Sequence, residues 1–113
     1  MSDINDVLKN EYSDGFNGKR KNRISELIIR RRRQVLVHSI IYYKMNQSLI
    51  SDSTWSKWAL ELEELQKKYP DIAKDLPYAE AFENFDHSTG SNLPLDDPWA
   101  NDRARQLVSN FDM

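Results

Sequence analysis

The chain has 113 residues, no cysteine, two histidines, 39% hydrophobic residues and a formal net charge of −2. This length suits one domain with a modest core. The absence of cysteine excludes disulfides, thiolate zinc sites and cysteine nucleophiles, and two histidines do not make a histidine-rich metal site. No segment approaches the ~20 apolar residues that span a bilayer, and the start of the chain lacks the apolar stretch of a secretory signal. We therefore expect a cytoplasmic protein without metal, cofactor or membrane partner.

Residues 1–22 are polar, contain Gly15 and Gly18, and show no sustained periodicity. They are predicted to be a flexible N-terminal segment, followed by a single helical domain over 23–113. Residues 23–46 contain no Gly or Pro and carry apolar residues at helical spacing, which predicts a long helix. The β-branched residues in this stretch also suit a strand, but the lack of alternation favours a helix.

Residues 53–69 predict a second helix with one narrow apolar stripe. Ser51, Asp52 or Ser53 is suited to accept the free amide hydrogens at its start, and Pro70 ends it. The stripe recurs at intervals of three and four residues, at Trp55, Trp58, Leu62, Leu65 and Tyr69. We expect this helix to form an antiparallel hairpin with the helix over 23–46.

The chain after the hairpin is predicted to contain two brief helices, over 71–75 and 78–85, separated by Pro77. Residues 87–92 are rich in turn-forming residues. They lack the Gly-Lys signature of a phosphate-binding loop, so we interpret them as a plain turn.

The last predicted helix covers residues 98–111. Asp97 is suited to cap its start, and Pro98 stands at the first helical position, where its missing N–H costs nothing. The apolar residues of this segment share one face, so we expect it to lie across the hairpin. The predicted fold class is all-α.

Charge is divided between the two halves of the chain. Up to Met45 there are ten basic and five acidic residues, and from Asn46 onward six basic and thirteen acidic residues. The basic and acidic side chains either pair with each other inside the protein, or they form two oppositely charged faces for a partner. The acidic half also suits mimicry of nucleic-acid phosphate, or simply a solvated helix face.

Four adjacent arginines, Arg30, Arg31, Arg32 and Arg33, form the most unusual motif, with Arg23 upstream. Successive helical residues rotate by about 100°, so the four side chains do not share one face. We expect this part of the helix to project beyond the hairpin and to expose the arginines to phosphates, to an acidic protein or to the chain's own acids. A solvated or internally paired run is the alternative.

The interhelical turn carries further candidate residues. Its aromatic side chains suit either a pocket for a nucleotide base or an ordinary core: Tyr42, Tyr43, Trp55 and Trp58. Asp52 suits a helix cap better than a ligand contact. His38, on a mostly apolar helix, is interpreted as a hydrogen-bonded, buried or half-buried residue, and His87 as a loop residue. Neither has a catalytic setting.

A combination of residues over roughly 32–70 resembles the small N-terminal helical domain of NAD-dependent DNA ligases. The matching residues are Ile41-Tyr42-Tyr43, Ile50-Ser51-Asp52, Trp55, Glu61-Leu62, Leu65 and Tyr69-Pro70. In that family the domain closes over the nicotinamide mononucleotide (NMN) half of NAD, using tyrosine, histidine and aspartate side chains around the interhelical turn. The resemblance therefore implies a helical hairpin and a vestigial nucleotide pocket.

The ligand-binding part of the motif departs from the family pattern. Tyr42 matches the family tyrosine and Asp52 the first aspartate, whereas Tyr43 replaces a histidine, Trp55 a second tyrosine and Ser56 a second aspartate. We therefore expect weak or absent binding of NMN and NAD. The Lys-x-Asp-Gly adenylation motif is absent from the sequence, which excludes ligation.

The chain is also similar to small bacteriophage proteins that carry a lone ligase-like hairpin. That likeness implies a scaffold with a new surface. The leading hypothesis is a non-enzymatic, phage-encoded module that binds and inhibits a host protein or nucleoprotein complex, for example in anti-defence. One alternative is a nucleotide-binding protein with a modified NMN pocket. The other is a nucleic-acid-binding accessory protein that uses the arginine run.

Overall fold

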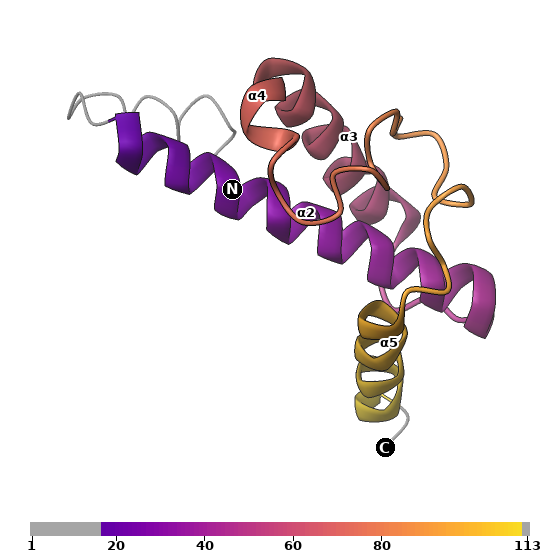
Figure 1. The fold of residues 1–113 in the computed structure, drawn as a ribbon. Coiled ribbons are helices and arrows are strands. Elements are labelled where there is room, and N and C mark those ends of the chain that lie inside the picture. Colours follow the sequence, from indigo (N-terminus) through magenta and orange to yellow (C-terminus); the bar gives the residue numbers. More distant parts are fainter. Residues whose placement is uncertain (1–16, 112–113) are drawn as a thin grey trace.

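The computed structural model describes residues 17–111, which form an all-helical fold without strands (Figure 1). This confirms the predicted fold class. The helices are α2 (Asn17–Met45), α3 (Asp52–Lys68), α4 (Pro70–Ala73) and α5 (Pro98–Phe111). Most of the N-terminal segment predicted to be flexible, residues 1–16, lies outside the described part of the chain.

Helix α2 has 29 residues and begins at Asn17, not at residue 23 as predicted. Gly18 does not prevent this early start, because a single glycine in a helix costs only about 1 kcal/mol relative to alanine. The helix ends at Met45 because Asn46 adopts a left-handed backbone with a φ of 55°. Asparagine is one of the few residues that tolerate this conformation after a helix.

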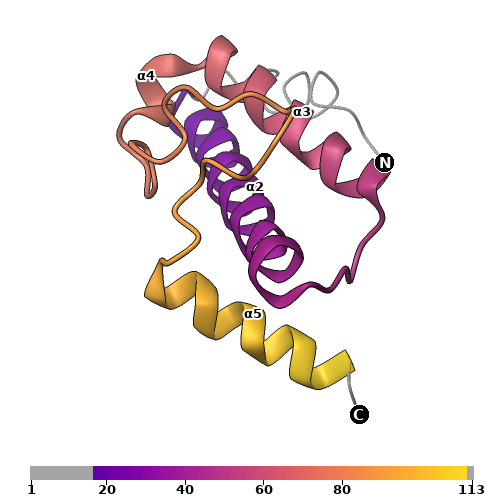
Figure 2. The same ribbon diagram turned by 90° about the vertical axis from the view of Figure 1, so that its right-hand side faces the viewer.

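Helices α2 and α3 form the predicted antiparallel hairpin (Figures 1 and 2). Ser51 caps α3, since its hydroxyl oxygen accepts a hydrogen bond from the Thr54 N–H at 3.1 Å. The hairpin core is apolar, and Leu36, Ile40 and Leu62 in it are fully buried. Removing such side chains from water is the main stabilising contribution to a hairpin of this kind.

The segment over 78–85 is a series of turns and not the predicted brief helix. Tyr78, directly after Pro77, has a φ of 68°, which a helix does not accommodate. Phe82 in this segment is fully buried, and its ring contacts that of Phe85 edge-on at 5.1 Å between centroids. The segment therefore covers the core without forming a regular element.

Helix α5 packs on α2 on the side opposite α3, so α2 lies between its two neighbours (Figure 2). Asp97 caps α5 as predicted, because its Oδ2 accepts the Ala100 N–H at 2.9 Å. Ala100 and Ala104 are fully buried, and their small side chains let the two helices approach closely. Lys44 Nζ donates to Asn101 Oδ1 at 3.2 Å and also joins the two helices.

Arg32 has an exposed fraction of only 2%, the smallest of any charged residue in the described chain. Its Nε donates to Gln66 Oε1 at 2.9 Å. Its two Nη atoms donate to the carbonyl oxygens of Ala73 at 2.9 Å, Leu76 at 3.3 Å and Pro77 at 2.9 Å. Burial lowers the pKa of Arg32 to about 10, so the guanidinium stays protonated at neutral pH. One side chain therefore joins α2 to α3 and to the turn after α4.

Arg31 is also buried, with an exposed fraction of 9%. Its Nε forms an ion pair with Glu61 Oε2 at 2.6 Å, and its Nη1 donates to Gln34 Oε1 at 2.6 Å. The guanidinium carbon lies 5.9 Å from the ring centroid of Trp58. This arginine therefore pairs with an acid of the second half of the chain.

The rotation of the helix divides the arginine run between two environments. Arg31 and Arg32 face the protein interior, whereas Arg30 and Arg33 are exposed. Arg33 lies over the ring of Trp99 on α5, with 5.1 Å between the guanidinium carbon and the ring centroid. The prediction that this part of the helix projects beyond the hairpin is wrong, because α3 and the turn after α4 cover one side of it.

Replacing Arg32 with Ala is expected to destabilise the protein by about 3 kcal/mol, because it removes a buried guanidinium that donates four hydrogen bonds and leaves its site in the core unfilled. Arg30→Ala is the matched control, and a surface substitution of this kind changes stability by about 0.5 kcal/mol or less. Urea unfolding followed by far-ultraviolet circular dichroism measures both. Equal stability of the two variants would contradict a structural role for Arg32.

Candidate ligand-binding cavity

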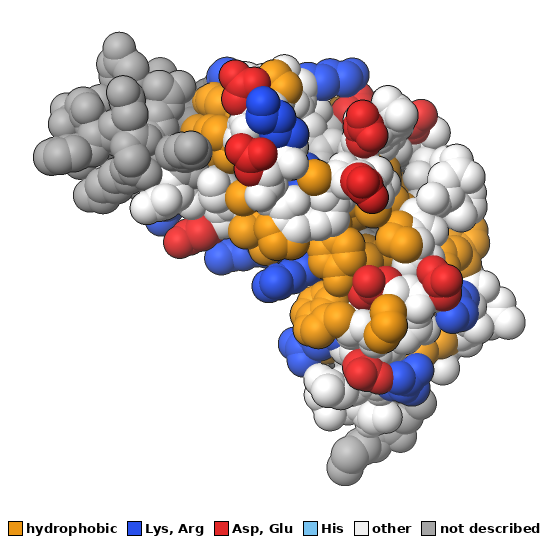
Figure 3. Space-filling model, viewed as in Figure 1, with side chains coloured by type: hydrophobic (Ala, Val, Ile, Leu, Met, Phe, Trp, Pro, Cys, Tyr) orange, Lys and Arg blue, Asp and Glu red, His pale blue; other side chains and the backbone are white. Residues whose placement is uncertain are grey.

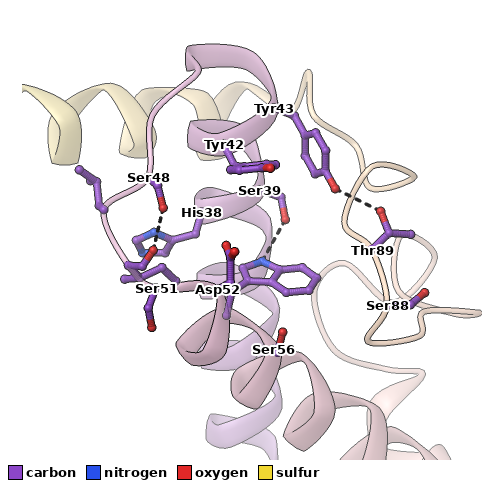
Figure 4. A pocket seen from close by; sticks show the side chains of 13 residues that line it. His38, Ser39, Tyr42, Tyr43, Ser48, Ser51, Asp52, Ser56, Ser88 and Thr89 are labelled. Carbon is purple, nitrogen blue, oxygen red and sulfur yellow. Dashed lines mark hydrogen bonds between the residues drawn. The ribbon is translucent and has the colours of Figure 1, made fainter.

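A cavity of about 230 Å³ lies between the last turns of α2, the 46–51 turn and the start of α3, with residues 88–89 forming a further wall (Figure 4). It contains the four residues proposed from the sequence as a vestigial nucleotide pocket. Its complete lining is His38, Ser39, Tyr42, Tyr43, Ser48, Leu49, Ile50, Ser51, Asp52, Trp55, Ser56, Ser88 and Thr89.

Three aromatic rings contribute to the lining, and two of them are held by hydrogen bonds. The Trp55 Nε1–H donates to Ser39 Oγ at 3.2 Å, and the Tyr43 hydroxyl lies 3.2 Å from Thr89 Oγ1. Tyr42 meets Tyr43 edge-on, with 5.0 Å between ring centroids, and is 55% exposed. Trp55 is half-buried, whereas Tyr43 is 42% exposed, so the cavity has one inner aromatic wall and two tyrosine side chains toward its open side.

Asp52 is the first residue of α3, and it does not cap the helix as expected, because Ser51 takes that position. Its carboxylate is free of the capping hydrogen bond and lines the cavity. In Figure 4 this carboxylate points toward the ring of Tyr42, across the space between α2 and α3. A negative charge in the first turn also interacts favourably with the helix dipole.

His38 lines the cavity from α2, one helical turn before Tyr42. Burial lowers the pKa of His38 below its ordinary value of 6.5, so the ring is neutral at physiological pH. The ring contacts Trp58 at 5.6 Å between centroids. Its Nδ1 is buried and has no hydrogen-bond partner, so the hydrogen bond expected for His38 is not formed at this atom.

The 86–92 loop reaches the cavity through a close contact at Gly90. Gly90 is buried, and an added Cβ there would overlap the Ser39 hydroxyl and lie 3.1 Å from Trp55 Cζ2. Glycine therefore permits the approach that brings Ser88 and Thr89 to the cavity wall.

Glu63 on α3 anchors the start of the same loop. Its Oε1 accepts hydrogen bonds from the His87 backbone N–H at 2.8 Å and lies 3.0 Å from His87 Nδ1. Lys67 Nζ donates to its Oε2 at 3.0 Å. The hydrogen bonds from the His87 side chain, and then those from Lys67, lower the pKa of Glu63 to about 2. His87 is thus a loop residue, as expected, and it ties the loop to the hairpin.

Among the described residues, no lysine or arginine belongs to the cavity lining, so the arginine run lies outside this site. In Figure 3, basic side chains gather along the edge of α2 that faces away from α3. The exposed members of the run are Arg30 and Arg33, and Arg23 is exposed on the same helix. The sequence hypotheses of a nucleotide pocket and of a basic binding surface therefore refer to different parts of the molecule.

Sequence reasoning missed the contribution of Ser88, Thr89 and Gly90. Their composition is typical of a plain turn, and nothing in their spacing indicates contact with α2 or α3. The contact depends on the path of the chain after α4, which no local pattern encodes. Within residues 17–111, no group of histidines and acids is arranged to hold a metal ion.

Gly90→Ala is expected to destabilise the protein by about 1–3 kcal/mol, because the added methyl group overlaps Ser39 in a filled site. Asn92→Ala, at an exposed position of the same loop, is the matched control. Thermal unfolding measures stability, and amide chemical shifts of Thr89 and Ser39 report displacement of the loop. A Gly90→Ala protein with unchanged stability and shifts would contradict the close contact.

Acid is expected to weaken the anchor of the loop. The pKa of Glu63 is lowered from 4.5 to about 2 in the folded protein, so its stabilising contribution is complete above about pH 4.5 and is lost as the pH falls through about 2. The stability difference between wild type and Glu63→Gln should therefore shrink from pH 6 to pH 2. Exposed Glu64→Gln is the control and should show little difference throughout. A difference independent of pH would count against the anchor.

The described helices include none with the length and hydropathy required to cross a membrane. Comparisons with family models, curated proteins and solved structures find no match to the chain. The resemblance to the ligase domain therefore rests on the residues quoted for it and stays a prediction.

Proposed function

We propose that this chain is a non-enzymatic binding module whose cavity between α2 and α3 holds a small molecule of about nucleoside size. The observation that carries the proposal is the convergence of Tyr42, Tyr43, Trp55 and Asp52 on one cavity. Aromatic walls with a few polar groups are typical of small-molecule sites. A vestigial nucleotide pocket was also the second sequence hypothesis.

The size of the cavity limits the ligand. Its volume of about 230 Å³ is below the roughly 300–1,000 Å³ of most ligand pockets. A single ring with a small substituent or a sugar matches this volume better than a dinucleotide. The absence of lysine and arginine from the lining also argues against tight binding of phosphate, in agreement with the expected weakness of NMN and NAD binding.

The hydrogen bonds of the lining support binding rather than catalysis. A serine nucleophile requires a base that accepts its hydroxyl proton. Ser39 instead donates to the carbonyl oxygen of Val35 at 2.7 Å, and Ser48 to that of Ile50 at 2.7 Å. These two hydroxyl groups therefore position the polypeptide and are not activated for chemistry.

A second candidate is the leading sequence hypothesis, binding and inhibition of a host protein or nucleoprotein complex. It is supported by the exposed pair of Arg33 and Trp99, since Trp and Arg are enriched at protein interfaces. The third hypothesis, a nucleic-acid-binding accessory protein, has less support from the structure than from the sequence. Burial of Arg31 and Arg32 leaves only Arg30 and Arg33 of the run for phosphate contacts.

The proposal is tested by titrating the full chain with nicotinamide riboside, adenosine and uridine, with binding followed by amide chemical shifts. At least one ligand should shift resonances of the cavity lining. Tyr42→Ala should weaken that binding about tenfold or more, because stacking on one aromatic ring contributes about 1–3 kcal/mol. Trp99→Ala is the matched control, since Trp99 is similarly exposed but does not line the cavity.

Two outcomes would contradict small-molecule binding at this site. One is the absence of shifts in the cavity lining with every ligand of the panel. The other is equal loss of affinity in Tyr42→Ala and Trp99→Ala, which would indicate nonspecific association with exposed aromatic rings.

A further inference from the structure

The charges around the cavity are of one sign. Within residues 17–111, Asp52 is the only acid in the lining, and neither lysine nor arginine contributes to it. His38 also lines the cavity, and burial lowers the pKa of its ring, so the ring stays neutral. The cavity therefore presents a negative charge that no basic side chain of the lining neutralises.

The faces of aromatic rings also carry negative electrostatic potential and attract cations. The half-buried Trp55 is held in place by its hydrogen bond to Ser39, so its ring does not have to become ordered when a ligand enters. Tyr43 is more exposed, and its hydroxyl lies 3.2 Å from Thr89 Oγ1. Tyr42 adds a third ring at the open side of the cavity. Aromatic rings combined with one carboxylate are the arrangement that recognises quaternary ammonium groups.

We propose that the ligand of this cavity is a compact organic cation with a quaternary nitrogen, held by the rings of Tyr42, Tyr43 and Trp55 with Asp52 as its counter-ion. This inference rests on the proposed small-molecule function and specifies the charge of the ligand. In Figure 4 the Asp52 carboxylate and the ring of Tyr42 border the same space, where a cation contacts both.

A quaternary nitrogen fits the hydrogen-bonding state of the cavity better than a primary amine. A primary ammonium group has three N–H donors that need acceptors when it leaves water. Ser39 is bonded to Val35 and Trp55, and Ser48 to Ile50, so these two hydroxyl groups are already engaged. In the described wall, the Asp52 carboxylate and His38 Nδ1 are free of protein hydrogen bonds. A quaternary cation has no N–H donors and requires only the rings and a counter-ion. An anion would instead meet the Asp52 carboxylate without a compensating positive side chain.

Two pairs of compounds test the charge preference directly. Choline and 3,3-dimethyl-1-butanol have the same shape and differ by the nitrogen charge. In the second pair, 1-methylnicotinamide has a cationic pyridinium ring and nicotinamide a neutral one. Binding of each compound to the full chain is measured by calorimetry at low salt and by amide chemical shifts. The cation of at least one pair is expected to bind tenfold or more tightly than its neutral partner. Preference for choline identifies an alkylammonium site, and preference for 1-methylnicotinamide a pyridinium site.

The Asp52→Asn variant distinguishes the contribution of the counter-ion to cation binding from that of the aromatic rings. Asp52 is exposed and does not cap α3, so this variant is expected to keep the fold, as thermal unfolding will check. Cation affinity should fall about tenfold while the affinity of the neutral partner stays unchanged. Asp71→Asn is the matched control, because Asp71 is also an exposed acid in the first turn of a helix, and it should leave both affinities unchanged.

The outcomes distinguish this inference from the function on which it rests. Equal binding of cation and neutral partner overturns the charge preference and leaves the small-molecule function in place. Binding of adenosine or uridine without any binding of the two cations also overturns the charge preference and leaves the small-molecule function in place. If no compound of either panel shifts the cavity resonances, both the inference and the proposed function fail.

Discussion

Burial of the Arg32 charge is the constraint on which the rest of the fold depends. A guanidinium in the interior needs acceptors on several sides, and here no carboxylate supplies them. The acceptors come from Gln66 on α3 and from the turn after α4, so the chain must fold back onto α2 after the hairpin. Gln66 extends the network, because its Nε2 donates to the Phe82 carbonyl at 2.9 Å. The segment that leads toward the 86–92 loop therefore starts from a fixed position.

The cavity is a consequence of that returning chain. The hairpin alone brings Tyr42, Tyr43, Asp52 and Trp55 to one end of the molecule, but it leaves that end open toward the side where residues 88–89 lie. The 86–92 loop closes part of it, tied to α3 by Glu63 and to α2 by the hydroxyl of Tyr43. Because the wall comes from a distant part of the sequence, its shape depends on every contact that directs the connection after α4.

The arrangement separates two recognition chemistries on the same long helix. Near its C-terminal end, α2 contributes rings and a neutral histidine to a cavity without basic side chains. Nearer its middle, the same helix presents Arg33 against Trp99 at the surface. The arginine run, which dominates the sequence, is thus half structural. A short ring-lined cavity, which is inconspicuous in the sequence, carries the stronger argument for function.

Local patterns in the sequence were enough to predict α3, α5 and most of α2, because the spacing of apolar residues, the caps at Ser51 and Asp97 and the stop at Pro70 act over a few residues. They did not predict the start of α2 at Asn17 or the turns that replace a helix over 78–85. They were also enough to place Tyr42, Tyr43, Asp52 and Trp55 around one turn, since a helical hairpin brings the two ends of its turn together. Only the tertiary structure decided which arginines are buried and that Gly90 brings a loop against Ser39. The physical reason is that burial of charge and closure of a cavity depend on partners far apart in the chain, and local periodicity carries no information about such partners.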